Sequence, residues 1–341
     1  MLRGALSGFG AVASQAHLPG WRLRPDVVLA AIHEPSPERR HQAHKLLKNV
    51  RIYDDLDLML EGEAPDFVDI ASPPAFHGAA ARKALAAGAH VLVEKPLCLD
   101  PAELDDLEKA AAANHRVLMC VHNWKHAPPY RKAHQLISSG RLGRIFHLAL
   151  TRWRSGPAGA GGTAINGERW RTDLNSGGGI LIDHGWHALY LAQWLMGGAA
   201  PMTVSAWLDR PDGAAVEDFA DLRLEYPDRR LASVNLSWRA IVRRTSAALF
   251  GADGALEIDG DRVVLTDRSG KIEDHSGADQ PDDSYHAAWF AGMAAEFVDA
   301  IAQGGGGAIA ASNLAEAKAA VCAIAAARRS AAAEGAPTRL F

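Results

Sequence analysis

The sequence predicts a two-domain chain. We expect an α/β domain with a doubly wound parallel sheet over residues 1–121, then an α+β domain with an open, mostly antiparallel sheet over residues 122–341. Three observations carry this prediction. The 341 residues exceed what one ordinary core holds. Short apolar runs alternate with alanine-rich helical stretches up to about residue 121, and strands of alternating polarity predominate after Gly143.

Short apolar runs predict the strands of the first domain. They cover residues 2–7, 27–32, 67–71, 90–93 and 117–121. Helical patterns lie between them, such as residues 79–87, which end at Gly88, a good C-terminal cap. Strands that alternate with helices form right-handed βαβ units, so the sheet is expected to be parallel.

Alternating polar and apolar residues predict the strands of the second domain. They cover residues 145–153, 204–209, 220–226, 231–239, 247–250, 255–258 and 263–266. Such alternation is typical of an antiparallel sheet with one face solvated or used in assembly. A helix over residues 183–196 interrupts the series. An alanine-rich helix over residues 310–333 follows near the end, and packing of this helix on the first domain is an open alternative.

Composition narrows the class of protein. Hydrophobic residues make up 48% and charged residues 22%, typical of a soluble globular protein, and the net charge of -4 gives no reason to expect nucleic acid or a membrane as partner. The three cysteines have no CxxC spacing, which argues against disulfides and thiolate zinc and fits a reducing cytoplasm. Residues 1–6 pass directly into a strand pattern, so we expect no signal peptide, and no apolar run is expected to span a bilayer.

A glycine-rich loop follows the first predicted strand. Its residues are Gly8, Phe9, Gly10, Ala11, Val12 and Ala13. In this GxGxxG/A arrangement Gly8 permits a tight turn, Gly10 lets the backbone approach a pyrophosphate, and the following helix N-terminus stabilises the phosphates. Glu34 ends the second strand, where a carboxylate binds the ribose. The pattern predicts NAD, while Arg39 and Arg40 keep NADP as the less favoured alternative, and a plain surface acid is the alternative for Glu34.

Glu94-Lys95-Pro96 follows the apolar strand at residues 90–93. Ligands on open α/β sheets bind beyond the carboxyl ends of such strands, so a lysine there can point at a ligand. The proline removes a backbone donor and fixes φ, which forces a sharp turn directly after Lys95.

Asp183 and His187 lie four positions apart in a predicted helix and so project from one face. Oxidation of a secondary alcohol requires removal of the hydroxyl proton, and histidine titrates near neutrality. Lys95 would stabilise the developing alkoxide, and Asp183 would orient the imidazole or hold a neighbouring hydroxyl. The alternatives are an N-cap for Asp183, a buried structural histidine for His187, and a metal site that adds His184. No further ligand cluster is evident, so we expect no metal.

Aromatic and cationic residues predict the substrate site. We expect it to contain Asn123, Trp124, Lys125, Trp153, Trp170 and Arg171. The first three follow a strand of the first domain, and the last three flank a glycine-rich stretch, residues 156–162, that we expect to be a mobile loop. Aromatic faces with a few polar groups suit a sugar or cyclitol ring, although the tryptophans can equally serve packing. The cationic residues Lys125, Arg152, Arg154 and Arg171 keep a phosphorylated or carboxylated substrate as an alternative. Such arginines are, however, usually solvated at the protein surface.

On these residues the chain resembles the glucose–fructose oxidoreductase/inositol dehydrogenase (Gfo/Idh/MocA) family over nearly its whole length. The matching segments are Gly8-Phe9-Gly10, the acidic strand end from Glu34 to Arg39, Ser72-Pro73-Pro74 with His77, Glu94-Lys95-Pro96, and Gly177 to Gly179 with Asp183, Gly185 and His187. The resemblance implies a Rossmann-type first domain, a Lys-Pro peptide that is often cis, and dimer or tetramer contacts through the open sheet.

The resemblance also implies roles for individual residues. The catalytic residues would be Lys95, Asp183 and His187. The cofactor would be bound by Gly8, Phe9, Gly10, Ala11, Val12, Glu34, Ser72, Pro73, His77, Glu94 and Lys95.

Two departures from the family pattern concern the substrate. Residues 122–128 lack the arginine that the family often has after the sixth strand. Tyr190 stands three positions after His187, where the family often has aspartate. Both positions are expected to contact the substrate, so the substrate of a better-known family member cannot be assigned to this chain.

We therefore expect a cytoplasmic, homo-oligomeric NAD(P)-dependent oxidoreductase that transfers hydride between nicotinamide and a secondary alcohol or carbonyl of a sugar, cyclitol or related polyol. One alternative is a redox-neutral NAD-dependent glycoside hydrolase or lyase. Another is a non-catalytic, nucleotide-sensing regulator, against which the joint presence of Lys95, Asp183 and His187 argues.

Overall fold

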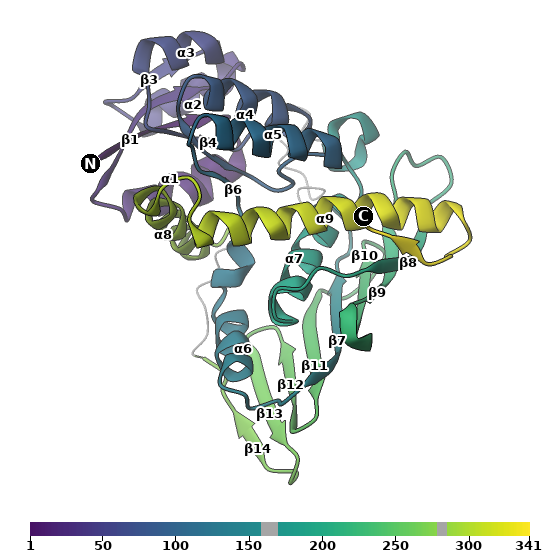
Figure 1. Ribbon diagram of the computed structural model, residues 1–341. Coiled ribbons are helices and arrows are strands. Elements are labelled where there is room, and N and C mark those ends of the chain that lie inside the picture. Colours follow the sequence, from purple (N-terminus) through teal and green to yellow (C-terminus); the bar gives the residue numbers. More distant parts are fainter. Residues whose placement is uncertain (158–169, 278–284) are drawn as a thin grey trace. The chain divides into compact units, whose positions relative to one another are not determined.

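The computed structural model describes residues 1–157, 170–277 and 285–341. The chain forms two compact units (Figure 1). Unit 1 comprises Met1–Asn123 with Asp282–Ala317, and unit 2 comprises Trp124–Pro281 with Lys318–Phe341. The glycine-rich stretch at residues 156–162 lies mostly outside the described residues.

Unit 1 contains a six-stranded parallel sheet, which confirms the doubly wound class. The strand order is β3-β2-β1-β4-β5-β6. The strands are β1 (Leu2–Ser7), β2 (Val27–His33), β3 (Arg51–Tyr53), β4 (Phe67–Ile70), β5 (His90–Val93) and β6 (Leu118–Cys120). The helices are α1 (Leu18–Arg22), α2 (Pro37–Leu46), α3 (Leu56–Glu63), α4 (His77–Ala86), α5 (Pro101–Ala113), α8 (Ala287–Gln303) and the first part of α9 (Ala308–Ala332), with short turns η1 (Ala13–His17) and η2 (Pro74–Phe76).

An aromatic cluster fills the core of unit 1. The rings of Trp21 and Phe67 lie 4.8 Å apart, and Phe67 packs edge-on against Phe297 of α8 at 5.6 Å. A side chain at Gly4 would overlap the Phe67 ring, which explains a glycine inside the central strand. Because α8 follows the second domain in the sequence, only the folded structure shows that it completes this core.

The helix after the glycine loop is not a regular α-helix. Residues Ala13–His17 form a π-turn in which the Leu18 N–H donates to the Ala13 carbonyl, and α1 continues from Leu18 through Pro19. A proline inside an α-helix lacks a donor and clashes with the carbonyl four residues earlier. The π-turn directly before Pro19 widens the helix where that clash would occur.

Unit 2 contains a nine-stranded sheet in the order β14-β13-β12-β11-β7-β10-β9-β8-β15 (Figure 1). The strands are β7 (Ile145–Trp153), β8 (Thr203–Asp209), β9 (Phe219–Glu225), β10 (Leu231–Ser237), β11 (Arg244–Gly251), β12 (Gly254–Asp259), β13 (Arg262–Asp267), β14 (Ile272–Asp274) and β15 (Thr338–Arg339). The helices are α6 (Pro128–Ser138), α7 (Trp186–Leu195) and the rest of α9, with short turns η3 (Asn123–His126, which begins in unit 1), η4 (Trp170–Thr172), η5 (Leu174–Ser176), η6 (Leu181–Gly185) and η7 (Pro227–Arg229).

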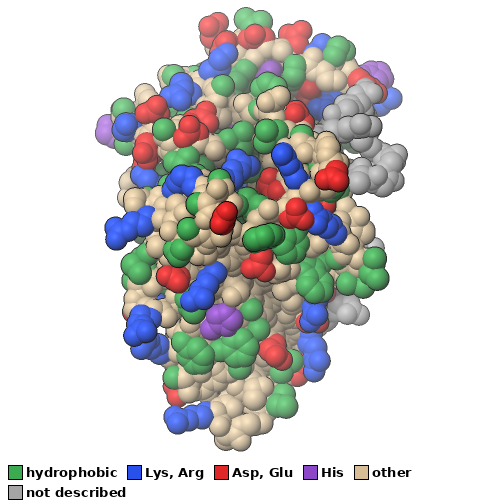
Figure 2. Space-filling model, turned by 90° about the vertical axis from the view of Figure 1, so that its right-hand side faces the viewer, with side chains coloured by type: hydrophobic (Ala, Val, Ile, Leu, Met, Phe, Trp, Pro, Cys, Tyr) green, Lys and Arg blue, Asp and Glu red, His purple; other side chains and the backbone are tan. Residues whose placement is uncertain are grey.

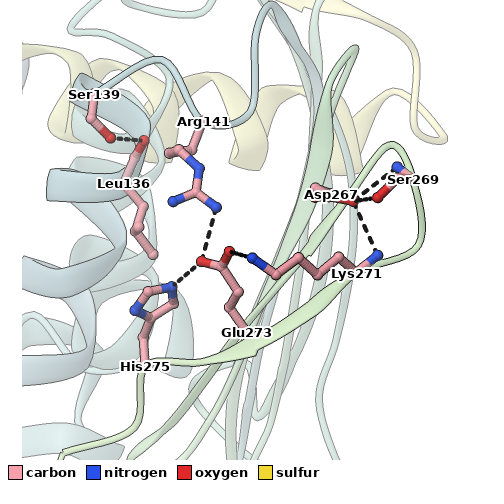
Figure 3. A network of polar contacts seen from close by, with 8 residues as sticks. All are labelled: Leu136, Ser139, Arg141, Asp267, Ser269, Lys271, Glu273 and His275. Atoms are coloured by element: carbon pink, nitrogen blue, oxygen red, sulfur yellow. Dashed lines mark hydrogen bonds and ion pairs between the residues drawn. The ribbon is translucent and has the colours of Figure 1, made fainter.

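The sheet of unit 2 is mostly antiparallel, as expected, and β7 and β10 form its parallel pair. Its β13–β14 edge is held by an ionic network (Figure 3). Glu273 accepts hydrogen bonds from Arg141 at 2.9 Å and Lys271 at 3.0 Å, and it lies 3.2 Å from His275. The hydrogen bonds from Arg141 and Lys271 lower the pKa of Glu273 to about 2. Charged side chains on an edge strand also oppose unwanted strand pairing.

Helix α9 contradicts the expectation that no apolar run is long enough to span a bilayer. By length and composition its 25 residues are apolar enough to cross a membrane, although 56% of the most apolar window is buried in the protein, as in the core helix of a soluble protein. The cysteines Cys98, Cys120 and Cys322 are free and buried in the structure. Figure 2 shows acidic and basic side chains interspersed on one face of the molecule, without a large area of one sign.

Candidate functional site

The glycine loop of unit 1 has the conformation that its sequence requires. Gly8 has φ +94°, and a Cβ there would lie 2.7 Å from the Ser72 amide nitrogen. Only glycine fits this left-handed, crowded position. Gly10 follows, and Ala11 and Val12 begin the helix, so the backbone turns from β1 into a helix N-terminus as a dinucleotide loop does.

Glu34 ties the loop to the end of β2. Its carboxylate accepts hydrogen bonds from the Phe9 N–H at 2.7 Å and the Ser36 N–H at 2.8 Å, and the residue is only 2% exposed. Arg39 lies 4.0 Å from the same carboxylate, and Arg40 donates to the Glu34 carbonyl. Glu34 is therefore a buried acid beside the glycine loop rather than a plain surface acid.

Ser72 and His77 adjoin the same loop. The hydroxyl oxygen of Ser72 is buried and makes no hydrogen bond. His77 is buried, and its two ring nitrogens lie 2.6 Å from the Pro96 carbonyl and 2.7 Å from the Ser72 carbonyl. Burial lowers the pKa of His77, although both carbonyl hydrogen bonds oppose the shift. His77 thus fastens the Ser72-Pro73 segment to the turn at Pro96.

A buried charge network supports Glu94, next to Lys95. His17 lies 2.9 Å from Asp69 through Nδ1 and 3.1 Å from Glu94 through Nε2. Glu94 also accepts a hydrogen bond from the Lys95 N–H at 2.8 Å. The Lys95–Pro96 peptide is cis, as the resemblance implied. Three charged groups in a row therefore connect the glycine-loop helix and β4 to the Lys95 backbone.

The network favours a protonated histidine. Burial by itself lowers the pKa of His17, but the charges and hydrogen bonds of Asp69 and Glu94 outweigh it and raise the pKa to about 9. Burial likewise opposes ionisation of Glu94, and His17 overcomes it and lowers the Glu94 pKa. Trp21 donates a further hydrogen bond to Asp69 at 2.7 Å, and Phe290 stacks on His17 at 3.8 Å.

Sequence reasoning missed His17 and Asp69. One signal was present, because Asp69 stands in the apolar strand Phe67–Ile70, where an acid must be paired if it is buried. Nothing in the sequence pointed from Asp69 to its partner, which lies in a helix 52 residues earlier.

In unit 2 the glycines before Asp183 fit a crowded turn. Gly179 has φ +109°, and a Cβ there would lie 2.3 Å from a carboxylate oxygen of Glu217. Glu217 accepts a hydrogen bond from the Leu181 N–H, and burial raises the pKa of Glu217. The expected helix over residues 183–196 begins instead with a π-turn, Leu181–Gly185, which holds Asp183. Such π-turns are frequent at functional sites.

Asp183 is buried and paired with an arginine. It is 4% exposed, and its carboxylate accepts a hydrogen bond from Arg171 Nε at 3.1 Å. The Arg171 guanidinium lies 4.4 Å from the ring of Trp170, so the structure brings these two predicted residues to Asp183. Its neighbour His184 accepts a hydrogen bond at Nδ1 from Trp238 at 3.1 Å. Among the described residues, no three His, Cys, Asp or Glu side chains are placed to hold a metal.

His187 is oriented by Tyr190, one of the two departures noted in the sequence. The Tyr190 hydroxyl lies 3.0 Å from His187 Nδ1 and also accepts a hydrogen bond from the Trp124 N–H at 3.1 Å. The Trp124 ring lies 5.5 Å from the His187 ring. Trp124 and His187 therefore belong to one cluster, which Tyr190 holds together.

The remaining predicted substrate residues are placed differently. Lys125 Nζ lies 5.5 Å from the ring of Trp194, and Asn123 begins η3. Trp153 alternates with Arg152 on β7, so its side chain lies on the opposite face of the sheet, where its indole N–H donates to Asn235 at 2.7 Å. The structure thus does not bring Trp153 to the cluster around Asp183 and His187.

Two family models match the chain. Residues 2–122 match a model described as "Oxidoreductase family, NAD-binding Rossmann fold", and residues 130–257 match the "GFO/IDH/MocA C-terminal domain".

Curated relatives share between a quarter and a third of their aligned residues with the chain. A D-glucoside 3-dehydrogenase of Escherichia coli is 29% identical over 205 residues, which cover 60% of this chain and 57% of that protein. A D-apiose dehydrogenase of Paraburkholderia graminis is 26% identical over 276 residues, which cover 79% of this chain and 70% of that protein. The chain therefore matches less than two thirds of the first of these relatives.

Solved structures match over nearly the whole chain. GenD2 from gentamicin A biosynthesis, in complex with NAD, is 26% identical with a TM-score of 0.82, over 99% of this chain and 96% of the other. A levoglucosan dehydrogenase in complex with NADH and levoglucosan has a TM-score of 0.86 at 21% identity, over 99% of both chains, and shows the common fold.

Proposed function

The chain belongs to the GFO/IDH/MocA family of oxidoreductases, and we propose that it is an NAD-dependent dehydrogenase or reductase that acts on a secondary alcohol or carbonyl of a sugar, cyclitol or related polyol. The observation that carries the proposal is the glycine loop, with its left-handed Gly8 and the buried Glu34 bonded to the Phe9 amide. The dehydrogenase names of both curated relatives support the sugar-type substrate.

Two features of unit 1 fit a dinucleotide. The buried Ser72 hydroxyl has no hydrogen-bond partner in the part of the chain that the structure describes, and such a group is costly unless a ligand or water completes it. The Gly8 position has no room for a side chain, as expected where backbone must approach a pyrophosphate. We assign NAD to this loop, with Glu34 toward the ribose hydroxyls. Arg39, 4.0 Å from Glu34, keeps NADP as the less favoured cofactor. NAD, when bound, supplies the hydride acceptor.

We assign the proton transfer to His187. Because Nδ1 faces the Tyr190 hydroxyl, Nε2 is the atom that accepts the proton of the substrate hydroxyl. The tyrosine fixes the ring so that little reorganisation is needed during the reaction. Arg171 donates a hydrogen bond to one carboxylate oxygen of Asp183, and we assign to Asp183 a further hydrogen bond from a neighbouring substrate hydroxyl.

We assign electrostatic stabilisation of the developing alkoxide to Lys95. Its backbone is fixed by the hydrogen bond from its N–H to Glu94 and by the turn at Pro96, which His77 fastens to the Ser72 segment.

The open face of the unit 2 sheet supports a homodimer or homotetramer. Trp207 is 65% exposed on this sheet, and Phe146 and Phe250 border an open hollow of about 270 Å³. Exposed apolar groups on a sheet face favour burial against a second copy. Three buried free cysteines support a reducing compartment such as the cytoplasm.

The experiment is nicotinamide absorbance of the purified protein with NAD or NADP and a panel of sugars and cyclitols. We expect reduction that depends on one class of polyol and is abolished in Lys95→Ala, while calorimetry shows that this variant still binds NAD. Loss of NAD binding in Lys95→Ala would contradict the role given to Lys95. A silent panel from protein that binds NAD would contradict the oxidoreductase proposal.

A further inference from the structure

Two arginines are buried in unit 2 at the end of strand β7. Arg152 is 1% exposed and Arg154, which directly follows the strand, is 9% exposed. Arg152 shares the face of Leu148 and Leu150, because side chains two positions apart point to the same side of a strand. This corrects the expectation that these arginines are solvated surface. Burial of a guanidinium is unfavourable unless an anion or a full set of hydrogen bonds compensates it.

The groups that accept hydrogen bonds from the buried Arg152 and Arg154 guanidinium groups are neutral, and they do not satisfy every donor. Arg152 donates to the Thr151 carbonyl at 3.0 Å, to the Ser246 carbonyl at 3.4 Å and to the Tyr130 hydroxyl, and its buried Nε has no partner among residues 1–157, 170–277 and 285–341. Arg154 donates to the Trp153 and Arg244 carbonyls and to the Thr245 hydroxyl. Within the part of the chain that the structure describes, neither arginine has an ion pair with a carboxylate.

The arginines belong to a cluster with an excess of positive charge. Burial, together with the charges of Arg243 and Arg152, lowers the pKa of Arg154 to about 10, and Asp183 opposes that shift. Arg171 already occupies one oxygen of Asp183. Asp183 is therefore the carboxylate whose charge acts on both Arg154 and Arg171.

The cluster adjoins the residue assigned as the base. The Arg152 guanidinium lies 4.8 Å from the Trp124 ring, and the ring of His187 lies 5.5 Å from the same Trp124 ring. Asp183, four residues before His187, accepts the bond from Arg171. An anionic group bound by these arginines would thus sit within one polyol ring of the reacting hydroxyl.

We propose that the polyol substrate carries an anionic group, a carboxylate or a phosphate, which Arg154 and Arg171 bind and which the charge of Arg152 stabilises. The inference rests on the proposed function, because it names the substrate class of the same site. Guanidinium groups match both anions through paired N–H donors, so the shared chemistry is a planar or tetrahedral oxyanion on a sugar or cyclitol.

The test is calorimetric binding to the protein saturated with NADH, using D-glucose, D-glucuronate and D-glucose 6-phosphate as probes. We expect at least one acidic probe to bind about 10- to 100-fold more tightly than glucose, as one or two charge-assisted hydrogen bonds provide. The comparison of the two acidic probes distinguishes carboxylate from phosphate. Equal affinity for glucose and both acids, or no measurable binding of either acid, would overturn the inference.

Variants separate recognition of the anion from a structural role. Arg154→Gln should weaken the acidic probe about 10- to 100-fold and glucose by less than about threefold. Arg171→Gln, at a side chain 20% exposed, provides a second variant if Arg154→Gln does not fold. It should weaken glucose to some extent, because Arg171 also holds Asp183, but it should weaken the acidic probe more. The matched control is Arg144→Gln, an exposed arginine just before β7, which should change neither affinity. Equal weakening of acid and glucose in both site variants would indicate structural arginines only and overturn the inference.

Failure of the anion site and failure of the proposed hydride transfer give different results. Reduction of NAD by neutral polyols alone would overturn the anionic substrate and leave hydride transfer standing. Selective binding of an acidic probe through Arg154, without hydride transfer to NAD from any acidic or neutral polyol, would support the anion site and contradict the proposed reaction.

Discussion

The charge on buried His17 makes a quantitative prediction about stability. The pKa of His17 is about 9 in the folded protein, against 6.5 for an ordinary histidine. The difference of about 2.5 corresponds to about 3 kcal/mol of folding free energy. Because the folded pKa is the higher one, this stabilisation is fully present below pH 6.5 and is lost as the pH rises to about 9.

His17→Gln removes the charge and keeps a side-chain amide that can still donate to one carboxylate. We expect the free energy of unfolding of the wild-type protein to exceed that of His17→Gln by about 3 kcal/mol more at about pH 6 than above about pH 9. Urea unfolding at both pH values measures the gap, and His44→Gln, at an exposed position on α2, is the control. A gap that does not change with pH would refute the assignment. So would a histidine titration, followed by NMR, that gives His17 an ordinary pKa.

Three further substitutions test the glycine loop of unit 1 and the His187 cluster of unit 2. Glu34→Ala should weaken NAD about tenfold and NADP less, because a carboxylate favours ribose hydroxyls over a 2′-phosphate; equal effects in calorimetric titrations would remove Glu34 from the ribose. Gly8→Ala should weaken NAD about 10- to 100-fold, because its Cβ would lie 2.7 Å from the Ser72 amide at φ +94° and the strain costs about 1–3 kcal/mol; unchanged affinity would contradict the cofactor loop. Tyr190→Phe should lower kcat about tenfold with KM for NAD unchanged, because His187 loses its orienting hydrogen bond; steady-state kinetics with full activity would exclude that role.

The sequence predicted the fold well where short-range pattern decides it. The apolar runs of β1, β4 and β5 and the alternation of β7 and β9 appear as strands in the structure, with ends shifted by at most a residue. The short edge strands β3, β14 and β15 carry two or three residues and too little pattern to be seen. Their pairing depends on neighbours that only the folded sheet supplies.

The candidate site was predicted less completely, because tertiary partners decide its chemistry. Strand alternation on β7 places Arg152 on the buried face and Trp153 on the opposite one, yet residue type alone indicated a solvated arginine and a substrate tryptophan. The pairing of His17 with Asp69 joins elements 52 residues apart. The position of Tyr190 was noted as a departure, but only the structure shows that its hydroxyl faces His187.

The measurement that tests the central claim most directly is the ratio of NADH formed to polyol consumed by the purified protein. Nicotinamide absorbance gives the first quantity, and chromatography of the polyol gives the second. A dehydrogenase that uses His187 as base and Lys95 as electrostatic stabiliser predicts one NADH for each polyol oxidised, and no consumption in Lys95→Ala. Consumption of polyol without accumulation of NADH would contradict net hydride transfer and indicate a redox-neutral reaction at the same site.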